Sequence, residues 1–294
     1  MRTPKLLTLM PTYRCTAACT DCGTYSSPQE RTTLDLPRML DAIDQAAGLG
    51  FAMVVFTGGE ATLRRQDLLA GIRRAAGLGL YTRLVTNAYW ARNREKAGKV
   101  LDTLVDAGLF EINFSTGDEH VKFVPVERVA TAVVEAMNRD LPVHVMIELK
   151  QEQTVTREGF LRHPLLGLLT EAQRERLSVR ESPWMPLDPV AVEEYPPGVA
   201  VDAETIVDRT GCDSMLRTYT VQADGRVASC CGLGMRSIPE LSVSTVDEEG
   251  FLARAVERSE SDLLKLWIHT LGPDRVLQWA AGKDPEIRWE GMYG

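Results

Sequence analysis

This chain of 294 residues lacks the features that mark a protein for export or for a bilayer. It has no low-complexity tract, and none of its apolar runs approaches the roughly 18 residues that a transmembrane helix needs. Its first residues, M-R-T-P-K-L-L-T-L-M-P, hold too short an apolar stretch for a signal peptide. We therefore expect a cytoplasmic location and no membrane partner.

The chain also has few positive charges. It contains 33 Lys and Arg residues against 41 Asp and Glu residues, which gives a net charge of −8. Such a chain is a poor partner for a nucleic-acid backbone, and the balance favours a basic or neutral substrate. The remaining composition, with 44% hydrophobic and 25% charged residues, is that of an ordinary globular chain. We expect one large domain or two unequal ones.

Three of the six cysteines stand close together, with Cys15, Cys19 and Cys22 in C-x3-C-x2-C spacing. In a long chain without an export signal, clustered cysteines indicate reduced, metal-binding thiols rather than disulfides. Three thiolates on one short loop can bind an iron–sulfur cluster, and because a cluster usually takes four cysteines, one iron would stay open. A structural zinc site is the alternative, although it needs a fourth ligand and the nearest histidine, His120, is distant in sequence.

Short β-branched or aliphatic runs alternate with amphipathic stretches over the first 190 residues, which is typical of βα units around a parallel sheet. Glycines that follow three apolar stretches are predicted to end helices, namely Gly48, Gly77 and Gly108. We expect six strands, at Leu6–Met10, Ala52–Thr57, Tyr81–Thr86, Glu111–Ser115, Val143–Leu149 and Leu177–Glu181. The expected helices are Leu36–Ala47, Asp67–Ala76, Arg92–Ala107, Val126–Arg139 and Leu165–Glu175.

Polar motifs follow four of these strands directly. The cysteine triplet comes after the first strand, T-G-G-E at Thr57–Glu60 after the second, T-N-A-Y-W at Thr86–Trp90 after the third, and S-T-G-D-E-H at Ser115–His120 after the fourth. Because ligands of parallel βα folds bind at the carboxyl ends of the strands, one face of the sheet should collect all four motifs.

The cysteine spacing, together with Gly58-Gly59-Glu60 one βα unit later, resembles the radical S-adenosylmethionine (radical SAM) enzymes over most of residues 5 to 190. The resemblance implies an α/β fold with a partial (β/α)6 TIM-type barrel at residues 1–190. It also implies a [4Fe–4S] cluster on the three cysteines and S-adenosylmethionine on the open iron, with the Gly-Gly-Glu segment holding the methionine amino group. Glycines permit close backbone approach, and a carboxylate suits an ammonium group.

In such enzymes an electron from the reduced cluster cleaves S-adenosylmethionine to a 5′-deoxyadenosyl radical, which abstracts hydrogen from the substrate. By family similarity four loop residues should contact the S-adenosylmethionine carboxylate and ribose, although each could instead cap a helix or a turn: Thr86, Asn87, Ser115 and Asp118. Arg180 could pair with a carboxylate at the adenine or substrate side. The family usually has an aromatic or apolar residue where Asp21 stands, so the adenine contact is expected from Tyr25.

The other three cysteines, Cys212, Cys230 and Cys231, follow a proline-rich stretch. Alternating residues around Ala223–Arg226 predict a β-hairpin that brings Cys212 and Cys230 together. This layout resembles the twitch domain, a short relative of the SPASM domain. It implies a β-hairpin plus helical auxiliary domain at residues 191–294, with a second iron–sulfur cluster on Cys212 and Cys230. Cys231 is either a third ligand or a free thiol that returns a hydrogen atom.

Enzymes with such auxiliary domains often modify ribosomally made peptides, so we expect a peptide precursor as substrate and epimerisation, thioether or carbon–carbon crosslink formation as the reaction. The alternative is a dehydrogenase or rearrangement enzyme acting on a small molecule in natural-product or cofactor biosynthesis. A free Cys231 favours epimerisation, and a ligating Cys231 favours an oxidative reaction. Flavodoxin or ferredoxin is the expected electron donor. A non-catalytic metal-binding protein is the alternative from another class.

Overall fold

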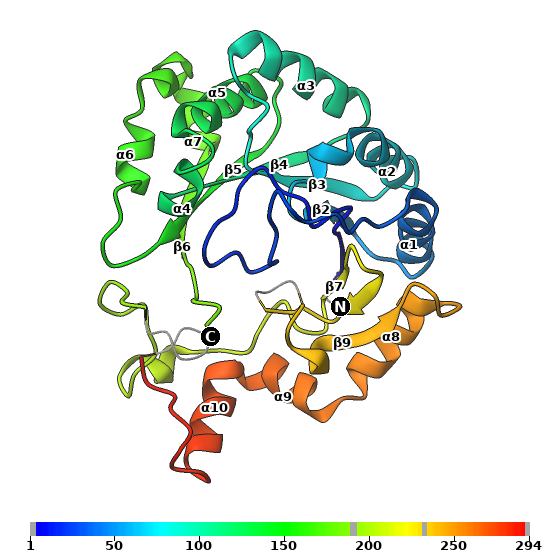
Figure 1. Cartoon of the computed structure of the whole chain (residues 1–294), viewed down its shortest axis with the longest axis vertical. Coiled ribbons are helices and arrows are strands. Elements are labelled where there is room, and N and C mark those ends of the chain that lie inside the picture. The colour runs from blue at the N-terminus through cyan, green and yellow to red at the C-terminus, as the bar shows by residue number, and fades with distance from the viewer. Residues whose placement is uncertain (1–3, 189–192, 231–233, 292–294) are drawn as a thin grey trace.

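The structure is a computed structural model that describes residues 4–188, 193–230 and 234–291 (Figure 1). Cys231 lies outside these residues. The described strands form one sheet in the order β6-β5-β4-β3-β2-β1-β7-β8-β9, with parallel pairing from β6 to β7 and antiparallel pairing from β7 to β9. The strands are β1 Leu6–Leu9, β2 Met53–Phe56, β3 Tyr81–Thr86, β4 Glu111–Thr116, β5 Val143–Leu149, β6 Ser178–Pro183, β7 Thr218–Val221, β8 Arg226–Ala228 and β9 Ser242–Thr245.

The six strands predicted for the parallel half are confirmed, with ends that differ by no more than two residues. Helices lie on the outer side of the curved sheet, which does not close into a full barrel among the described residues (Figure 1). The helices are α1 Leu36–Gly48, α2 Arg65–Gly77, α3 Arg94–Asp106, α4 Asp118–Val121, α5 Val126–Met137, α6 Arg157–Leu161, α7 Glu171–Arg176, α8 Phe251–Glu260, α9 Leu263–Leu271 and α10 Pro273–Ala281, with 3-10 turns η1 Ala61–Arg64, η2 Pro164–Leu168, η3 Thr205–Asp208 and η4 Pro239–Leu241.

Two helices end within one residue of the prediction, but not at the glycines predicted to end them. Gly48 and Gly77 lie inside the last turns of α1 and α2, and the left-handed glycine comes two residues later, at Gly50 with φ +74° and Gly79 with φ +80°. In α1 the buried Phe51 donates its N–H to the carbonyl of Ala46, which closes the helix end in a Schellman arrangement. Gly108, with φ +100°, follows the end of α3 as predicted.

The expected helix Leu165–Glu175 is also wrong, because the chain divides into η2 and α7. Thr170 accepts a hydrogen bond from the backbone of Gln173, whose side chain in turn accepts one from the Thr170 N–H. This capping box starts a new helix at Glu171, so the preceding Leu169 takes an extended conformation.

The predicted hairpin is confirmed as β7 and β8, and it continues the main sheet because β7 pairs with the free edge of β1. Tyr219, Val221 and Val227 join the main hydrophobic core, and α8 packs against α1 (Figure 1). The domain boundary at residue 190 therefore crosses a continuous sheet and stays a prediction. Among the described helices, none is both long enough and apolar enough to cross a bilayer.

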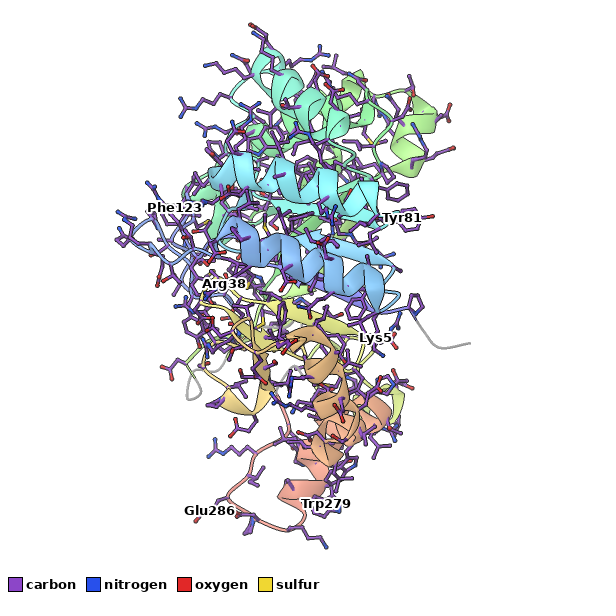
Figure 2. All side chains as sticks on the ribbon, turned by 90° about the vertical axis from the view of Figure 1, so that its right-hand side faces the viewer. Lys5, Arg38, Tyr81, Phe123, Trp279 and Glu286 are labelled. Atoms are coloured by element: carbon purple, nitrogen blue, oxygen red, sulfur yellow. The ribbon has the colours of Figure 1, made fainter. Side chains whose placement is uncertain are left out.

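The amino ends and the carboxyl ends of the parallel strands lie on opposite sides of the molecule. Figure 2 shows Lys5, just before β1, and Tyr81, at the start of β3, on one side of the molecule. Phe123, which follows β4 and α4, lies on the other side. The loops that carry the polar motifs leave the sheet on this second side, as the parallel βα pattern predicts.

Candidate active site

A cavity of about 210 Å³ lies at the carboxyl ends of the parallel strands, and we name it the cysteine cavity. It brings together eight of the predicted site residues: Cys15, Cys19, Cys22, Gly58, Gly59, Thr86, Asn87 and Ser115. They come from the loops after β1, β2 and β3 and from the carboxyl ends of β3 and β4, so the expectation that one face collects these four motifs is confirmed. The cavity is also lined by three further members of these motifs, Thr57, Thr116 and His120, and by three residues outside them, Glu148, Ser182 and Trp184.

The three thiols are half-buried and close enough to interact electrostatically. Burial raises the pKa of the Cys15 thiol to about 12, and burial together with the charges of Cys22 and Cys15 raises the pKa of Cys19. Among the described residues, no three Cys, His, Asp or Glu side chains gather around one ion-sized position. An iron–sulfur cluster takes each thiolate at a different iron atom. Thiols of this kind stay protonated near neutral pH and release protons when a metal group binds.

Gly58 and Gly59 pack against the chain that leads into Cys15. A Cβ on Gly58, whose φ is +119°, would lie 2.6 Å from the Thr12 carbonyl oxygen, and one on Gly59 would lie 2.3 Å from that of Arg14. The Gly59 N–H donates to the Thr12 carbonyl at 2.9 Å. Both glycines are therefore required by the close approach of two backbone segments, and they form a smooth wall of the cavity beside the thiols.

The Glu60 carboxylate lies away from the cavity surface. It is 1% exposed and accepts hydrogen bonds from the Thr62 N–H and hydroxyl at 3.2 and 2.6 Å and from the Asn87 N–H at 3.0 Å. The Thr86 hydroxyl lies 3.0 Å from both carboxylate oxygens. Burial raises the Glu60 pKa, and these donors oppose the rise. Glu60 thus joins the start of η1 to the end of β3, and its predicted contact with an ammonium group stays a prediction.

Asn87 connects the loop after β3 to the cysteine loop, which we define as residues 15–27. Its side-chain amide donates to the Thr16 hydroxyl at 3.0 Å and to the Cys15 sulfur at 3.7 Å. Its amide oxygen accepts the Tyr89 N–H at 3.1 Å, which fixes which end of the amide faces the thiol. Asn87 therefore orients Cys15 within the cavity wall.

Besides Glu60, three predicted cofactor-binding residues lie outside the cavity lining. Asp118 accepts hydrogen bonds from Thr154, at its N–H and hydroxyl, and from the Val155 N–H, so it anchors the loop after β5. Arg180 is exposed on β6, whereas Ser182 and Trp184 further along reach the cavity. The Tyr25 hydroxyl lies 3.0 Å from the Ser237 hydroxyl and not at the cavity wall. An adenine contact by Tyr25 finds no support in this geometry.

Glu148, at the end of β5, is a site residue that the sequence reasoning missed. It is 3% exposed, and its Oε1 accepts the N–H groups of Glu119 at 2.7 Å and His120 at 3.2 Å. Its Oε2 is buried without a hydrogen-bond partner among the described residues. A Cβ on Gly117 would lie 2.0 Å from the Glu148 Cγ. A carboxylate near the carboxyl end of a strand that follows the glycine-containing motif Ser115–His120 was the available signal.

Asp21, which departs from the family pattern, binds the segment after β6. Its Oδ1 accepts the Leu187 N–H at 3.2 Å, and Lys150 lies 3.7 Å from Oδ2. In the same segment, the Trp184 carbonyl accepts the Tyr195 hydroxyl at 2.6 Å, and the Trp184 ring lies 5.4 Å from the His120 ring. Asp21 therefore ties the cysteine loop to the segment that carries the aromatic wall of the cavity.

Cys212 and Cys230 are anchored by different elements. The Cys212 N–H donates to the Ile268 carbonyl of α9 at 3.1 Å. Cys230 follows β8, and its carbonyl accepts the Thr220 hydroxyl at 2.7 Å. With Cys231 outside the described residues, a second cluster on these cysteines stays a prediction.

A curved parallel βα sheet whose loops gather three thiols, two glycines and an asparagine around one cavity defines a cofactor-binding enzyme scaffold. Residues 9–149 match the model of the Radical SAM superfamily, so this part of the chain is similar to a radical SAM domain. That family implies a [4Fe–4S] cluster and S-adenosylmethionine. The residues present fit these groups, because three separated thiols and a glycine wall line one cavity.

The sequence is also similar to those of curated proteins of one kind, the PqqA peptide cyclases. The chain is 34% identical over 116 residues to the PqqA peptide cyclase of Bradyrhizobium diazoefficiens, a match that covers 38% of this chain and 28% of the relative. It is 28% identical over 192 residues to the PqqA peptide cyclase of Xanthomonas oryzae pv. oryzae, covering 62% of this chain and 48% of the relative. The chain thus spans between about a quarter and a half of the length of these relatives.

Among solved structures, the fold is similar to that of Streptococcus suis SuiB bound to the precursor peptide SuiA. The superposition has a TM-score of 0.52 at 14% sequence identity, and it covers 92% of this chain and 67% of that chain. The likeness concerns the fold.

Proposed function

We propose that this chain is a radical SAM enzyme that modifies a ribosomally synthesised peptide. The observation that carries the proposal is the meeting of Cys15, Cys19 and Cys22 with Gly58 and Gly59 at one cavity. The peptide as substrate class is supported by the sequence likeness to PqqA peptide cyclases and by the fold likeness to SuiB, which was solved with its precursor peptide.

When bound, the cluster and S-adenosylmethionine supply a carbon-centred radical that takes a hydrogen atom from a substrate C–H bond. The chain's own residues prepare that step. The three thiols lose their protons to hold iron, and Asn87 keeps Cys15 oriented through its amide donor. Gly58 and Gly59 leave room for the methionine part of S-adenosylmethionine beside the thiols. Trp184 and His120 close the opposite side and limit water access.

An electron donor such as flavodoxin or ferredoxin would provide the electron. A second cluster on Cys212 and Cys230 is part of the proposal, with Cys231 as a third ligand or as a free thiol. A ligating Cys231 favours oxidative crosslinking, in which two electrons leave the substrate. A free Cys231 favours epimerisation, in which the thiol returns one hydrogen atom to a Cα radical.

Iron and sulfide counts after anaerobic reconstitution test the cluster assignments. We expect two clusters in the parent protein and one in the Cys15→Ala, Cys19→Ala, Cys22→Ala triple variant. A Cys212→Ala, Cys230→Ala double variant is the matched control and should keep the cluster that cleaves S-adenosylmethionine. A triple variant that retains no iron would remove the second cluster from the proposal.

Product analysis tests the substrate class. Short peptides encoded beside this chain are incubated with the reconstituted protein, S-adenosylmethionine and dithionite, and are then analysed by mass spectrometry. A crosslink lowers the peptide mass by two hydrogens, and epimerisation in heavy water adds one deuterium. Deuterium incorporation that persists in Cys231→Ala would exclude that thiol as the hydrogen donor, and unchanged peptides in all cases would contradict peptide modification.

A further inference from the structure

The turn that follows β8 docks on the cysteine loop just after its third cysteine. We call residues 234–238 the docking turn. The Gly234 N–H donates to the Gly23 carbonyl at 3.1 Å, and the Ser237 and Tyr25 hydroxyls lie 3.0 Å apart. Segments more than two hundred residues apart in sequence are therefore joined beside Cys22.

Arg236 is the centre of this contact. Its Nη1 donates to the carbonyls of Thr24 at 3.1 Å and Tyr25 at 2.7 Å, and its Cζ lies 3.8 Å from the centre of the Tyr13 ring. Its Nη2 lies 3.6 Å from a Glu30 carboxylate oxygen, and its side chain is 21% exposed. A guanidinium that stacks on an aromatic ring and donates to two carbonyls is held in one place, and it interacts more strongly when partly withdrawn from water.

A small apolar cluster, separate from the main core, packs beneath the contact between the docking turn and the cysteine loop. It consists of Met10, Tyr13, Ala223, Ala228 and Met235. Its members come from the first parallel strand's end, the hairpin and the docking turn, so burial of these side chains fixes the turn against the start of the cysteine loop.

The cysteine loop needs such support at Tyr25. Tyr25 has φ +50°, in the left-handed region that costs free energy for a residue with a Cβ, and its N–H donates to the Cys22 carbonyl at 2.7 Å. Arg236 binds the Tyr25 carbonyl and lies 6.0 Å from the Tyr25 ring centre. The conformation that presents Cys22 is thus tied to a cation from the far end of the chain.

Charge is distributed unevenly around the three thiols. Glu119 accepts the Thr20 N–H at 3.3 Å next to Cys19 and pairs with Lys122 at 2.7 Å, and Glu148 lies in the cavity wall, so the Cys19 side carries two carboxylates and one ammonium group. Arg236 is held at the carbonyls that follow Cys22, so a cation faces the other side. A positive charge stabilises the form of a cluster that has gained an electron, and a negative charge opposes it.

We propose that Arg236 is a positioning residue for the Cys22 end of the cysteine loop and that its charge raises the reduction potential of the cluster held there. The second part rests on the proposed function, and the first does not. Reduction adds one electron from the external donor and breaks no bond, so the guanidinium acts only through its field and its hydrogen bonds. The C-terminal region thereby sets the geometry and the potential of a site whose described thiols all come from the cysteine loop.

The test compares Arg236→Lys and Arg236→Gln with Arg254→Gln as the matched control. Arg254 is exposed on α8 and donates to the Glu249 carbonyl, away from the cysteine loop. In the apoprotein we expect hydrogen exchange at Gly23–Tyr25 and alkylation of Cys22 to rise several-fold in both Arg236 variants. The parent and the Arg254 variant should stay alike. Tyr25→Phe, which deletes only the hydroxyl contact, should give a smaller rise and extends the test if Arg236→Gln folds poorly.

In the reconstituted protein, redox titration followed by electron paramagnetic resonance measures the potential. Arg236→Gln should have a more negative midpoint potential than the parent, while Arg236→Lys should keep most of the parent value because it keeps the charge. Exchange, alkylation and potential that match those of Arg254→Gln would overturn the proposal. A parent that assembles no cluster would contradict the proposed function alone, since the apoprotein measurements still decide the positioning role.

Discussion

The two walls of the cysteine cavity are built in different ways. The wall from β1 to β3 consists of thiols, glycines and the side chains of Thr86 and Asn87, and the Glu60 carboxylate behind it is turned away and bound by protein donors. The wall from β4 to β6 exposes Glu148, His120 and Trp184 to the cavity. The first wall fits a cofactor that the whole family shares, and the second supplies the side chains with which a particular enzyme can differ from its relatives.

The largest effect is expected at the glycine wall. In Gly59→Ala the new Cβ would lie 2.3 Å from the Arg14 carbonyl oxygen, so the cysteine loop or the strand end must move. We expect loss of the iron held by the cysteine loop and a decrease in the free energy of unfolding of more than about 2 kcal/mol. Reconstitution and denaturant titration measure both quantities.

Gly77→Ala is the matched control, because Gly77 lies in α2 and a Cβ at this position would meet no atom within 4 Å. Alanine at this helical position should leave iron binding unchanged and should be neutral or stabilising by up to about 1 kcal/mol. Equal losses in the two variants would mean that the close approach at Gly59 has no special role.

The next effect is expected at the opposite wall. In Glu148→Ala the N–H groups of Glu119 and His120 lose their buried acceptor, which should cost about 1–3 kcal/mol of folding stability. Glu148→Gln keeps an acceptor oxygen, so its stability should be nearer that of the parent. Thermal unfolding of both variants beside Glu158→Ala, an exposed control on α6, makes the comparison. A loss in Glu148→Gln as large as in Glu148→Ala would show that charge and not hydrogen bonding dominates.

A smaller effect is expected at the link between the walls. In Asp21→Ala the Leu187 N–H and Lys150 lose a partner, so the segment that carries Trp184 should loosen while the fold persists. We expect a stability change of about 1 kcal/mol and faster hydrogen exchange at residues 184–188. Unaltered exchange in this segment would show that the Tyr195 contact alone holds Trp184 in place.

The smallest effect is a dependence of apoprotein stability on pH. Burial raises the Cys15 pKa from 9.0 to about 12, so the folded state holds its proton more tightly than the unfolded state. The stability from this group is fully present below about pH 9 and is lost as the pH rises toward 12. The melting temperature of the parent should therefore fall more steeply above pH 9 than that of Cys15→Ala. Parallel curves would contradict the burial of this thiol.

The first wall could be predicted from the sequence because its signals are local. The cysteine spacing and the Gly-Gly-Glu segment each occupy a few residues, and a parallel βα pattern is enough to bring Cys15 and Gly58 to one edge. The direction in which a side chain points cannot be predicted from a short motif, because it depends on the surrounding donors and acceptors. Glu60 and Asp118 were predicted to face the cofactor, yet both bind nearby backbone N–H groups.

The second wall and the contacts of the cysteine loop depend on partners far along the chain. Asp21 meets Leu187, and Tyr25 meets Ser237, across separations that no motif spans. The hairpin was predicted from its turn. Its pairing with β1 was not predicted, because no sequence pattern indicates which strand pairs with the free edge of β1. Glu148 became visible as a site residue only when β5 was placed beside β4.

Cleavage of S-adenosylmethionine by the anaerobically reconstituted protein tests the central claim most directly. The parent with dithionite should release 5′-deoxyadenosine and methionine, and the Cys15→Ala, Cys19→Ala, Cys22→Ala variant should release none. The Cys212→Ala, Cys230→Ala control should still release both products. A parent that binds iron and sulfide but forms no 5′-deoxyadenosine, or a triple variant that forms as much as the parent, would contradict the account.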